Sequence, residues 1–214
     1  MDELPETLDE TYERILLGID KEKREHAIRL LQCLAFSRRP LRAKELAEVL
    51  SIQFDTAIPR LKTRFRPRNS DEAVLSACST LVSIIEPDGP TFYRNDVRVE
   101  RSSHYSRAGR AKPRAKRQRK LDDQVEDVRV VQFSHYSVKE FLTSERLRKS
   151  DKGDLYQFYI SPEPAHTVLA QTCISILLRV KPRPRIGVIT KNFPLAEYAA
   201  QNWFHHAQCD SVAS

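Results

Sequence analysis

The tetrapeptide SHYS occurs twice in this chain, so His104 and His135 lie in identical local sequence. His104 is surrounded by arginines and serines, with no apolar residue to hold it in place. His135 lies between a predicted strand, DVRVVQF, and a helix predicted to begin directly after it. A helix start has four backbone N–H groups without partners, and its dipole favours an anion. We therefore expect His135, and not His104, to contact an anion such as phosphate. The alternative is a structural histidine that satisfies a backbone carbonyl at the strand end.

Other residues with reactive side chains give no catalytic or metal site. His205, His206 and Cys209 suggest zinc, but adjacent helical side chains point about 100° apart, so we expect no metal site there. The chain has no GxSxG and no cysteine–histidine pair with supporting context, so we expect no enzyme. The five glycines are isolated, there is no GxxxxGK[ST], and no apolar run ends in paired acids. The sequence thus has no nucleotide-binding loop or Mg²⁺ site of its own, and we expect no cofactor in isolation.

Positive charge is concentrated in one segment. The formal net charge is +7, but residues 98–120 contain ten Lys or Arg and one Glu, which leaves 26 basic and 28 acidic residues elsewhere. Its densest part is KPRAKRQRK, with Lys112, Arg114, Lys116, Arg117, Arg119 and Lys120. Three interpretations remain open: a solvated disordered tip, a nuclear-localisation signal, or weak and non-specific contact with nucleic acid.

Four cysteines indicate the compartment. Cys33, Cys78, Cys173 and Cys209 are widely spaced without a CxxC pair, and three of them lie in apolar helical patterns. They predict buried free thiols in a reducing compartment, which is the cytoplasm, or the nucleus if the basic segment acts as a localisation signal. No apolar run is long enough to cross a membrane, and the acidic N-terminus lacks the pattern of a signal peptide, so we expect no membrane partner.

Hydrophobic periodicity predicts a mainly α protein with a small β-wing. The N-terminal segment, residues 1–20, is predicted to contain a short helix that begins with a capping box at Thr7 and ends near Gly18. Helices are then predicted at 21–36, 43–50 and 72–79, and strands at 81–86, 91–93 and 128–133. Three helices followed by a β-hairpin is the order of a winged helix, here over 21–136. The strands at 81–86 and 128–133 are predicted to pair as the wing, with a basic insertion at 95–127 between them.

The remaining part, 137–214, is predicted to be an α-helical region. A capping box at Ser137 and Glu140 begins one helix, and SPEP begins another that reaches about Val180. The last helix extends from Leu195 to about Gln208. Its apolar face is predicted to include Ala199, Trp203 and Phe204.

Several ordered segments resemble a known family. FSHYSVKEFLTS resembles the motif that closes the winged helix of NACHT-type STAND NTPases, the signalling ATPases that include NOD-like receptors. Five further segments resemble, in order, the region after the NACHT module of fungal receptors of this type. They are LPETLDETYERIL, HAIRLLQCLAFSRRPLRAKELAEVL, DEAVLSACSTLVSII, SPEPAHTVLAQTCISILL and FPLAEYAAQNW. Such receptors commonly continue into ankyrin or similar repeats. The winged-helix part is also known as the GPI inositol-deacylase winged helix family.

The resemblance implies a role for one residue and a set of partners. In STAND proteins the histidine of this motif reaches the β-phosphate of bound ADP, and position for position that residue is His135. The nucleotide-binding domain itself has no counterpart here, so 1–20 would be a helical linker from a missing NTPase module, and ADP or ATP would bind only together with a NACHT domain. The expected function is a non-catalytic regulatory module that couples nucleotide state to C-terminal repeats. The alternative is a nuclear DNA-binding winged-helix protein that uses its basic wing, although the third helix of the triad, EAVLSACS, has few side chains that read bases.

Overall fold

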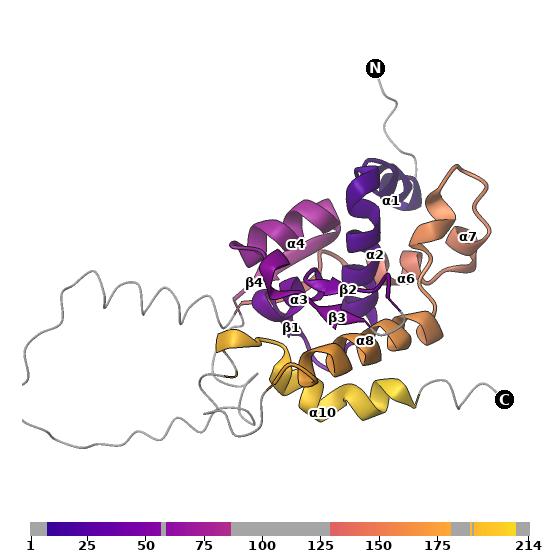
Figure 1. The fold of residues 1–214 in the computed structure, drawn as a ribbon. Coiled ribbons are helices and arrows are strands. Elements are labelled where there is room, and N and C mark those ends of the chain that lie inside the picture. The colour runs from indigo at the N-terminus through magenta and orange to yellow at the C-terminus, as the bar shows by residue number, and fades with distance from the viewer. Residues whose placement is uncertain (1–7, 57–58, 87–128, 181–188, 190, 209–214) are drawn as a thin grey trace, which may run out of the picture.

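The protein is mainly α-helical with a small antiparallel sheet, as the sequence predicts (Figure 1). The computed structural model describes residues 8–56, 59–86, 129–180, 189 and 191–208. Thr7, at which a capping box is predicted, the predicted strand at 91–93 and the whole of the basic insertion at 95–127 lie outside these residues.

Three helices form the helical part of a winged helix. They are α2 (Lys21–Phe36), α3 (Ala43–Val49) and α4 (Ser70–Cys78), close to the predicted bounds. The apolar stripe of α2 is fully buried at Ala27, Leu30 and Leu31. Burial of a leucine side chain contributes about 1.5–3 kcal/mol, so this stripe is a main source of stability. The side chain of Asn69 accepts a hydrogen bond from the backbone N–H of Glu72 and so caps α4.

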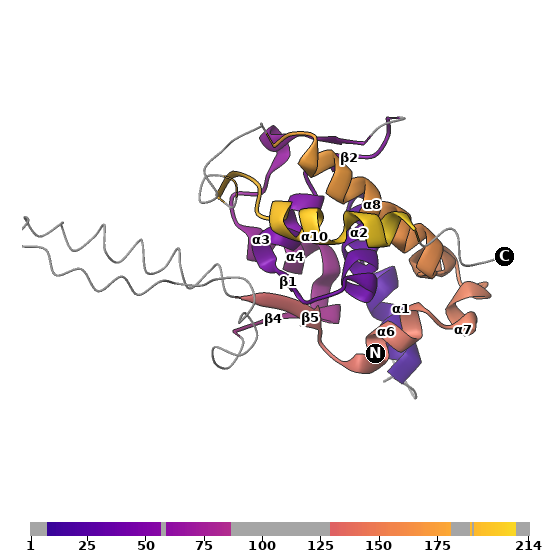
Figure 2. The same cartoon turned by 90° about the horizontal axis from the view of Figure 1, so that it is seen from below.

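The wing is a three-stranded sheet in the order β1-β5-β4 (Figure 2). Strand β4 (Val82–Ile85) pairs antiparallel with β5 (Val130–Phe133), from Val82 opposite Phe133 to Ile85 opposite Val130. The predicted pairing of the two wing strands is therefore confirmed. A short strand, β1 (Leu41–Arg42), pairs with the other edge of β5 and was missed, because two residues carry no periodic signal.

The connection between α3 and α4 contains a second sheet that the sequence analysis also missed. Strands β2 (Ile52–Gln53) and β3 (Arg60–Leu61) pair antiparallel, and a single 3₁₀ turn (Thr63–Phe65) follows. Ile52 and Leu61 are buried opposite each other, which attaches this loop to the core.

Among the described residues, the C-terminal region contains α6 (Tyr136–Leu142), α7 (Glu145–Arg148), a 3₁₀ helix (Leu155–Phe158), α8 (Pro162–Leu177) and α10 (Ala196–Ala207). Helices α8 and α10 lie side by side, and α8 also packs against α2 of the winged helix (Figures 1 and 2). The buried residues of α10 are Ala196, Tyr198, Ala199, Asn202 and His206. The prediction that Trp203 and Phe204 belong to the buried face was wrong, because both are exposed.

A single buried cluster joins all these elements. It includes Tyr12 and Leu16 of α1 (Leu8–Leu17), the stripe of α2, and residues of α8 and α10 as far as Ala199. The predicted N-terminal helix, the winged helix and the C-terminal helices thus share one hydrophobic core among the described residues.

Candidate functional site

His135 is the N-cap residue of α6 and directly follows β5 through Ser134. Its Nδ1 accepts a hydrogen bond from the backbone N–H of Ser137 at 3.3 Å and lies 2.6 Å from the Oγ of the same serine. A neutral imidazole that accepts at Nδ1 has its hydrogen on Nε2. The helix cap therefore selects the tautomer in which Nε2–H is a donor.

The imidazole of His135 remains accessible. Both His135 and its neighbour Tyr136 are exposed, and their ring centroids are 4.3 Å apart. Among the described residues, the hydrogen bonds of His135 use only Nδ1. Nε2–H is thus available to an acceptor supplied from outside this part of the chain.

Two features of this junction differ from the sequence analysis. Ser137 was predicted to begin a capping box with Glu140, but the helix has already begun at Tyr136 and its N-cap is His135. The expected alternative role of His135, a bond to a strand-end carbonyl, is replaced by a bond to a helix N–H. Because α6 has only seven residues, its dipole is a weak source of anion affinity, and the relevant donor is Nε2–H.

Helix α1 connects this site to the core. The hydroxyl groups of Tyr12 and Ser137 lie 2.7 Å apart, and the ring of Tyr12 packs against Phe141 with centroids 5.5 Å apart. Glu13 accepts hydrogen bonds from Arg146 at 3.4 Å and Lys152 at 2.6 Å. A chain of polar contacts therefore leads from the core side of α1 through Ser137 to Nδ1 of His135.

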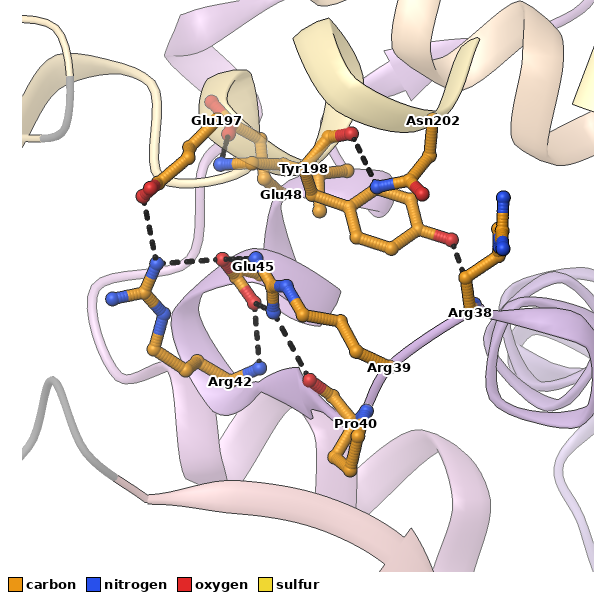
Figure 3. A network of polar contacts seen from close by, with 10 residues as sticks. Arg38, Arg39, Pro40, Arg42, Glu45, Glu48, Glu197, Tyr198 and Asn202 are labelled. Atoms are coloured by element: carbon orange, nitrogen blue, oxygen red, sulfur yellow. Dashed lines mark hydrogen bonds and ion pairs between the residues drawn. The ribbon is translucent and has the colours of Figure 1, made fainter. Parts of the chain in front are cut away.

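The second set of buried polar side chains lies on α3 (Figure 3). The Glu45 carboxylate is fully buried and accepts two hydrogen bonds from the Arg39 guanidinium, both at 2.8 Å. It also accepts from the backbone N–H and the guanidinium of Arg42, again at 2.8 Å. Burial alone would raise the pKa of Glu45, but its hydrogen bonds and ion pairs with these two arginines outweigh burial and lower the pKa.

One turn further along α3, Glu48 links the winged helix to α10. Its carboxylate accepts a hydrogen bond at 2.9 Å from the backbone N–H of Leu195, the N-cap residue of α10, and pairs with Arg66. On the same side Arg42 lies 3.6 Å from Glu197 of α10 (Figure 3). Burial raises the pKa of Glu48, and the N–H of Leu195 and the charge of Arg66 oppose this only in part. The N-terminus of α10 is thus attached to α3 by specific buried polar bonds.

Neither glutamate was identified as important from the sequence. The available signal was the position of Glu45 three residues after the N-cap Arg42. A carboxylate at this position accepts a hydrogen bond from the backbone N–H of the N-cap residue. Glu48 had no local signal, because its partner Leu195 is distant in sequence.

The basic residues named above as contacts for nucleic acid, Lys112 to Lys120, lie outside the described residues. Helix α4, which would enter a DNA groove in the alternative function, is described. Its exposed side chains include Glu72, Leu75 and Ser76, and its first turn is acidic. This face has neither the positive charge nor the amide groups typical of base recognition.

The predicted thiols are buried where the structure describes them. Cys33, Cys78 and Cys173 are free and buried, and burial raises the pKa of Cys78 and Cys173 to about 12. Cys209 lies outside the described residues, whereas His205 and His206 lie close to His166 of α8.

Comparison with known proteins finds a relative that matches most of this chain. The azaphilone pigments biosynthesis cluster protein L of Monascus ruber is 30% identical over 207 residues, which is 95% of this chain and 35% of that protein. The chain therefore spans about a third of the length of this relative. No family model and no solved structure matches the chain. Among the described helices, none combines the length and apolar character that a membrane span requires.

Proposed function

We propose that this chain is a non-catalytic regulatory and interaction module of a NACHT/STAND-type signalling receptor. The observation that supports this proposal best is the exposed His135 at the N-cap of α6, with Nδ1 engaged and Nε2–H available. In such a receptor, Nε2–H would donate to a phosphate of ADP held by a NACHT nucleotide-binding domain. A hydrogen bond to a charged group contributes about 1.5–3 kcal/mol, which suits a contact that biases a switch.

Coupling to the rest of a receptor needs more than this bond. To move a two-state equilibrium from 1:99 to 99:1 requires about 5.5 kcal/mol of differential binding, so packing between domains must contribute most of it. Two polar connections favour such coupling. Tyr12 and Ser137 connect α1 to His135, and Glu48 connects α3 to the start of α10. A displacement of the winged helix would therefore move α10, and with it any repeats that follow.

The relative from Monascus ruber is compatible with a module of this kind, because this chain matches only 35% of it. Its name places it with a pigment biosynthesis cluster and states no reaction. We propose no catalytic role for the chain. We propose a cytoplasmic location, or a nuclear one if the basic segment acts as a localisation signal.

The proposal is tested by substitutions that separate the two nitrogens of His135. His135→Asn keeps a good N-cap side chain but removes the Nε2–H donor, whereas His135→Ala removes both. In a chimera that places a NACHT domain before this chain, the rate of ADP release should rise at least about tenfold in both variants. This increase is expected for the loss of about 1.5–3 kcal/mol of binding free energy. Only His135→Ala should also lower the melting temperature.

Two controls accompany this experiment. His104→Ala, in the other SHYS sequence, should leave ADP release unchanged. The chain alone should neither hydrolyse nor tightly bind Mg·ATP, because its sequence has no phosphate-binding loop. Unchanged ADP release in His135→Asn would show that His135 is only a helix cap.

The alternative function, a nuclear DNA-binding protein with a basic wing, rests on the charge of residues 98–120. The exposed face of α4 does not favour it. Binding to one DNA sequence by a variant that lacks 98–120 would favour this alternative, since base reading would then come from the helices.

A further inference from the structure

Three histidine rings meet between α8 and α10. His166 of α8 and His206 of α10 are buried, while His205 is exposed at the rim. One ring nitrogen from each of the three lies within 4.8 Å of the others, and the three ring centroids are 5.0 to 5.7 Å apart. The 100° between adjacent helical positions does not keep the rings of His205 and His206 apart. The third ring comes from another helix, 40 residues away in sequence.

The buried pair is already arranged by hydrogen bonds. Nδ1 of His166 lies 2.8 Å from Nδ1 of His206, and Nε2 of His206 lies 2.8 Å from the hydroxyl of Tyr198. That hydroxyl accepts a hydrogen bond from the backbone N–H of Arg38 at 3.2 Å. In a neutral pair, one hydrogen lies between the two Nδ1 atoms, and the other nitrogen of the contact presents its lone pair.

We propose that His166, His205 and His206 form a binding site for a divalent transition-metal ion of the zinc type. The ion would take the place of the hydrogen between the two buried Nδ1 atoms, and the ring that carried this hydrogen would hold it on Nε2 instead. His205 would complete a three-histidine set. Because His205 is exposed, water has access to the site and would be the fourth ligand. This inference is independent of the proposed receptor function.

The geometry requires only small movements. Zinc–nitrogen bonds of 2.0–2.1 Å at tetrahedral angles place two ligand nitrogens about 3.3 Å apart. The two Nδ1 atoms would separate by about 0.5 Å from their present 2.8 Å. His205 has to move furthest, and an exposed side chain near the end of α10 can change rotamer at low cost.

The surroundings support a metal ligand role for His206. The Tyr198 hydroxyl at Nε2 is the kind of outer partner that orients a metal-bound histidine.

The type of ligand determines which ion fits. Three imidazoles suit Zn²⁺, Cu²⁺ or Ni²⁺, whereas Mg²⁺ and Ca²⁺ require oxygen ligands. The three-residue set contains no carboxylate, and Arg38 lies close enough to act on His206. The bound ion would therefore keep its positive charge beside an arginine, and we expect affinity below that of structural zinc sites with thiolate ligands.

A bound ion would fasten α8 to α10 and so stabilise the C-terminal helices. A ligand at one hundred times its dissociation constant stabilises the folded state enough to raise the melting temperature of a chain of this size by roughly 5–10 °C. The effect would be specific to nitrogen-preferring ions.

The test uses the untagged full chain after treatment with a chelator. Zn²⁺ should bind with a stoichiometry of one by calorimetry, raise the melting temperature by roughly 5–10 °C when saturating, and compete with Co²⁺. Bound Co²⁺ should show the intense visible absorption of tetrahedral coordination. Mg²⁺ should have no effect.

Substitution of the exposed ligand avoids effects on folding. His205→Ala should weaken Zn²⁺ binding at least tenfold and abolish the melting shift, while its melting temperature without metal stays at the wild-type value. His26→Ala, which removes an exposed helical histidine of α2, is the matched control and should bind like the wild type. No melting shift with Zn²⁺, or equal binding by His205→Ala and the wild type, would overturn the proposal.

Discussion

Replacement of Glu45 by alanine should destabilise the protein more than any exposed charge substitution. The carboxylate is fully buried on α3 and accepts hydrogen bonds from Arg39, from the Arg42 guanidinium and from the Arg42 backbone N–H, all at 2.8 Å. Removal of the carboxylate leaves two guanidinium groups close together without their shared partner. It also removes the bond that closes the first turn of α3.

The size of this effect follows from the exposure of the partners. Removal of one member of a buried ion pair costs about 3–5 kcal/mol when the remaining charge stays buried. The side chains of Arg39 and Arg42 are each 22% exposed, so water can solvate them in part, and we expect the lower end of this range. A loss of about 3–4 kcal/mol should lower the melting temperature of a chain of this size by roughly 6–16 °C.

Urea denaturation of the wild type, Glu45→Ala and Glu145→Ala measures the loss directly. Glu145 of α7 pairs with Arg148 and Lys149, and all three side chains are more than half exposed, so its substitution should change the unfolding free energy by less than about 0.5 kcal/mol. Equal m-values would show that only stability has changed. If Glu45→Ala loses no more than about 1 kcal/mol, the network on α3 is no stronger than a surface pair, and the reasoning here is wrong.

The acid sensitivity of Glu45, the DNA binding of the basic segment and the reactivity of the thiols can be tested in parallel. Because its arginine partners hold the folded-state pKa of Glu45 below its unfolded value of about 4.3, its stabilisation is present above that pH and is lost as pH falls through the folded pKa. The stability advantage of the wild type over Glu45→Gln should therefore shrink in urea titrations below about pH 4. Deletion of residues 98–120 should leave the melting temperature unchanged and remove any DNA binding. In the wild type, any such binding should be independent of DNA sequence. If six phosphates are contacted, the logarithm of the binding constant should fall with the logarithm of the salt concentration with a slope near −5. Anisotropy with two unrelated duplexes measures both properties. In a Cys209→Ser variant, no thiol should react with a thiol reagent before unfolding and three should react afterwards, because the remaining cysteines are buried with raised pKa values. Rapid reaction in the native state would contradict this.

The sequence predicted the elements that carry a local signal. Helix α2 has its predicted bounds, because a continuous apolar stripe ends before the breaker at Pro40. The wing strands β4 and β5 were found by their β-branched, apolar residues, and they pair as predicted. Strand β1 was missed, since two residues pair with β5 only through tertiary structure.

The candidate sites show the same contrast between features with a local sequence signal and features that depend on tertiary structure. His135 lies at a strand–helix junction as predicted, but its role as N-cap was assigned to Ser137, because a hydroxyl is the more common helix cap. The partner of Glu48 and the third histidine beside His205 and His206 come from distant segments. Local periodicity contains no information on such contacts, which depend on how α8 and α10 pack.

The wing has a consequence for the order of folding. Strands β4 and β5 are joined by residues 86–129, although they pair as directly as the strands of a tight hairpin. Closure of a loop about tenfold longer than a hairpin turn costs roughly 2 kcal/mol more chain entropy. That entropy is lost before strand contacts can compensate for it, so non-local pairing of this kind is slow. Helices α2, α3 and α4 are contiguous in sequence and can associate first, whereas β1 must wait for β5. In its folding kinetics, the wing is therefore a long-range tertiary contact, although in topology it is a hairpin.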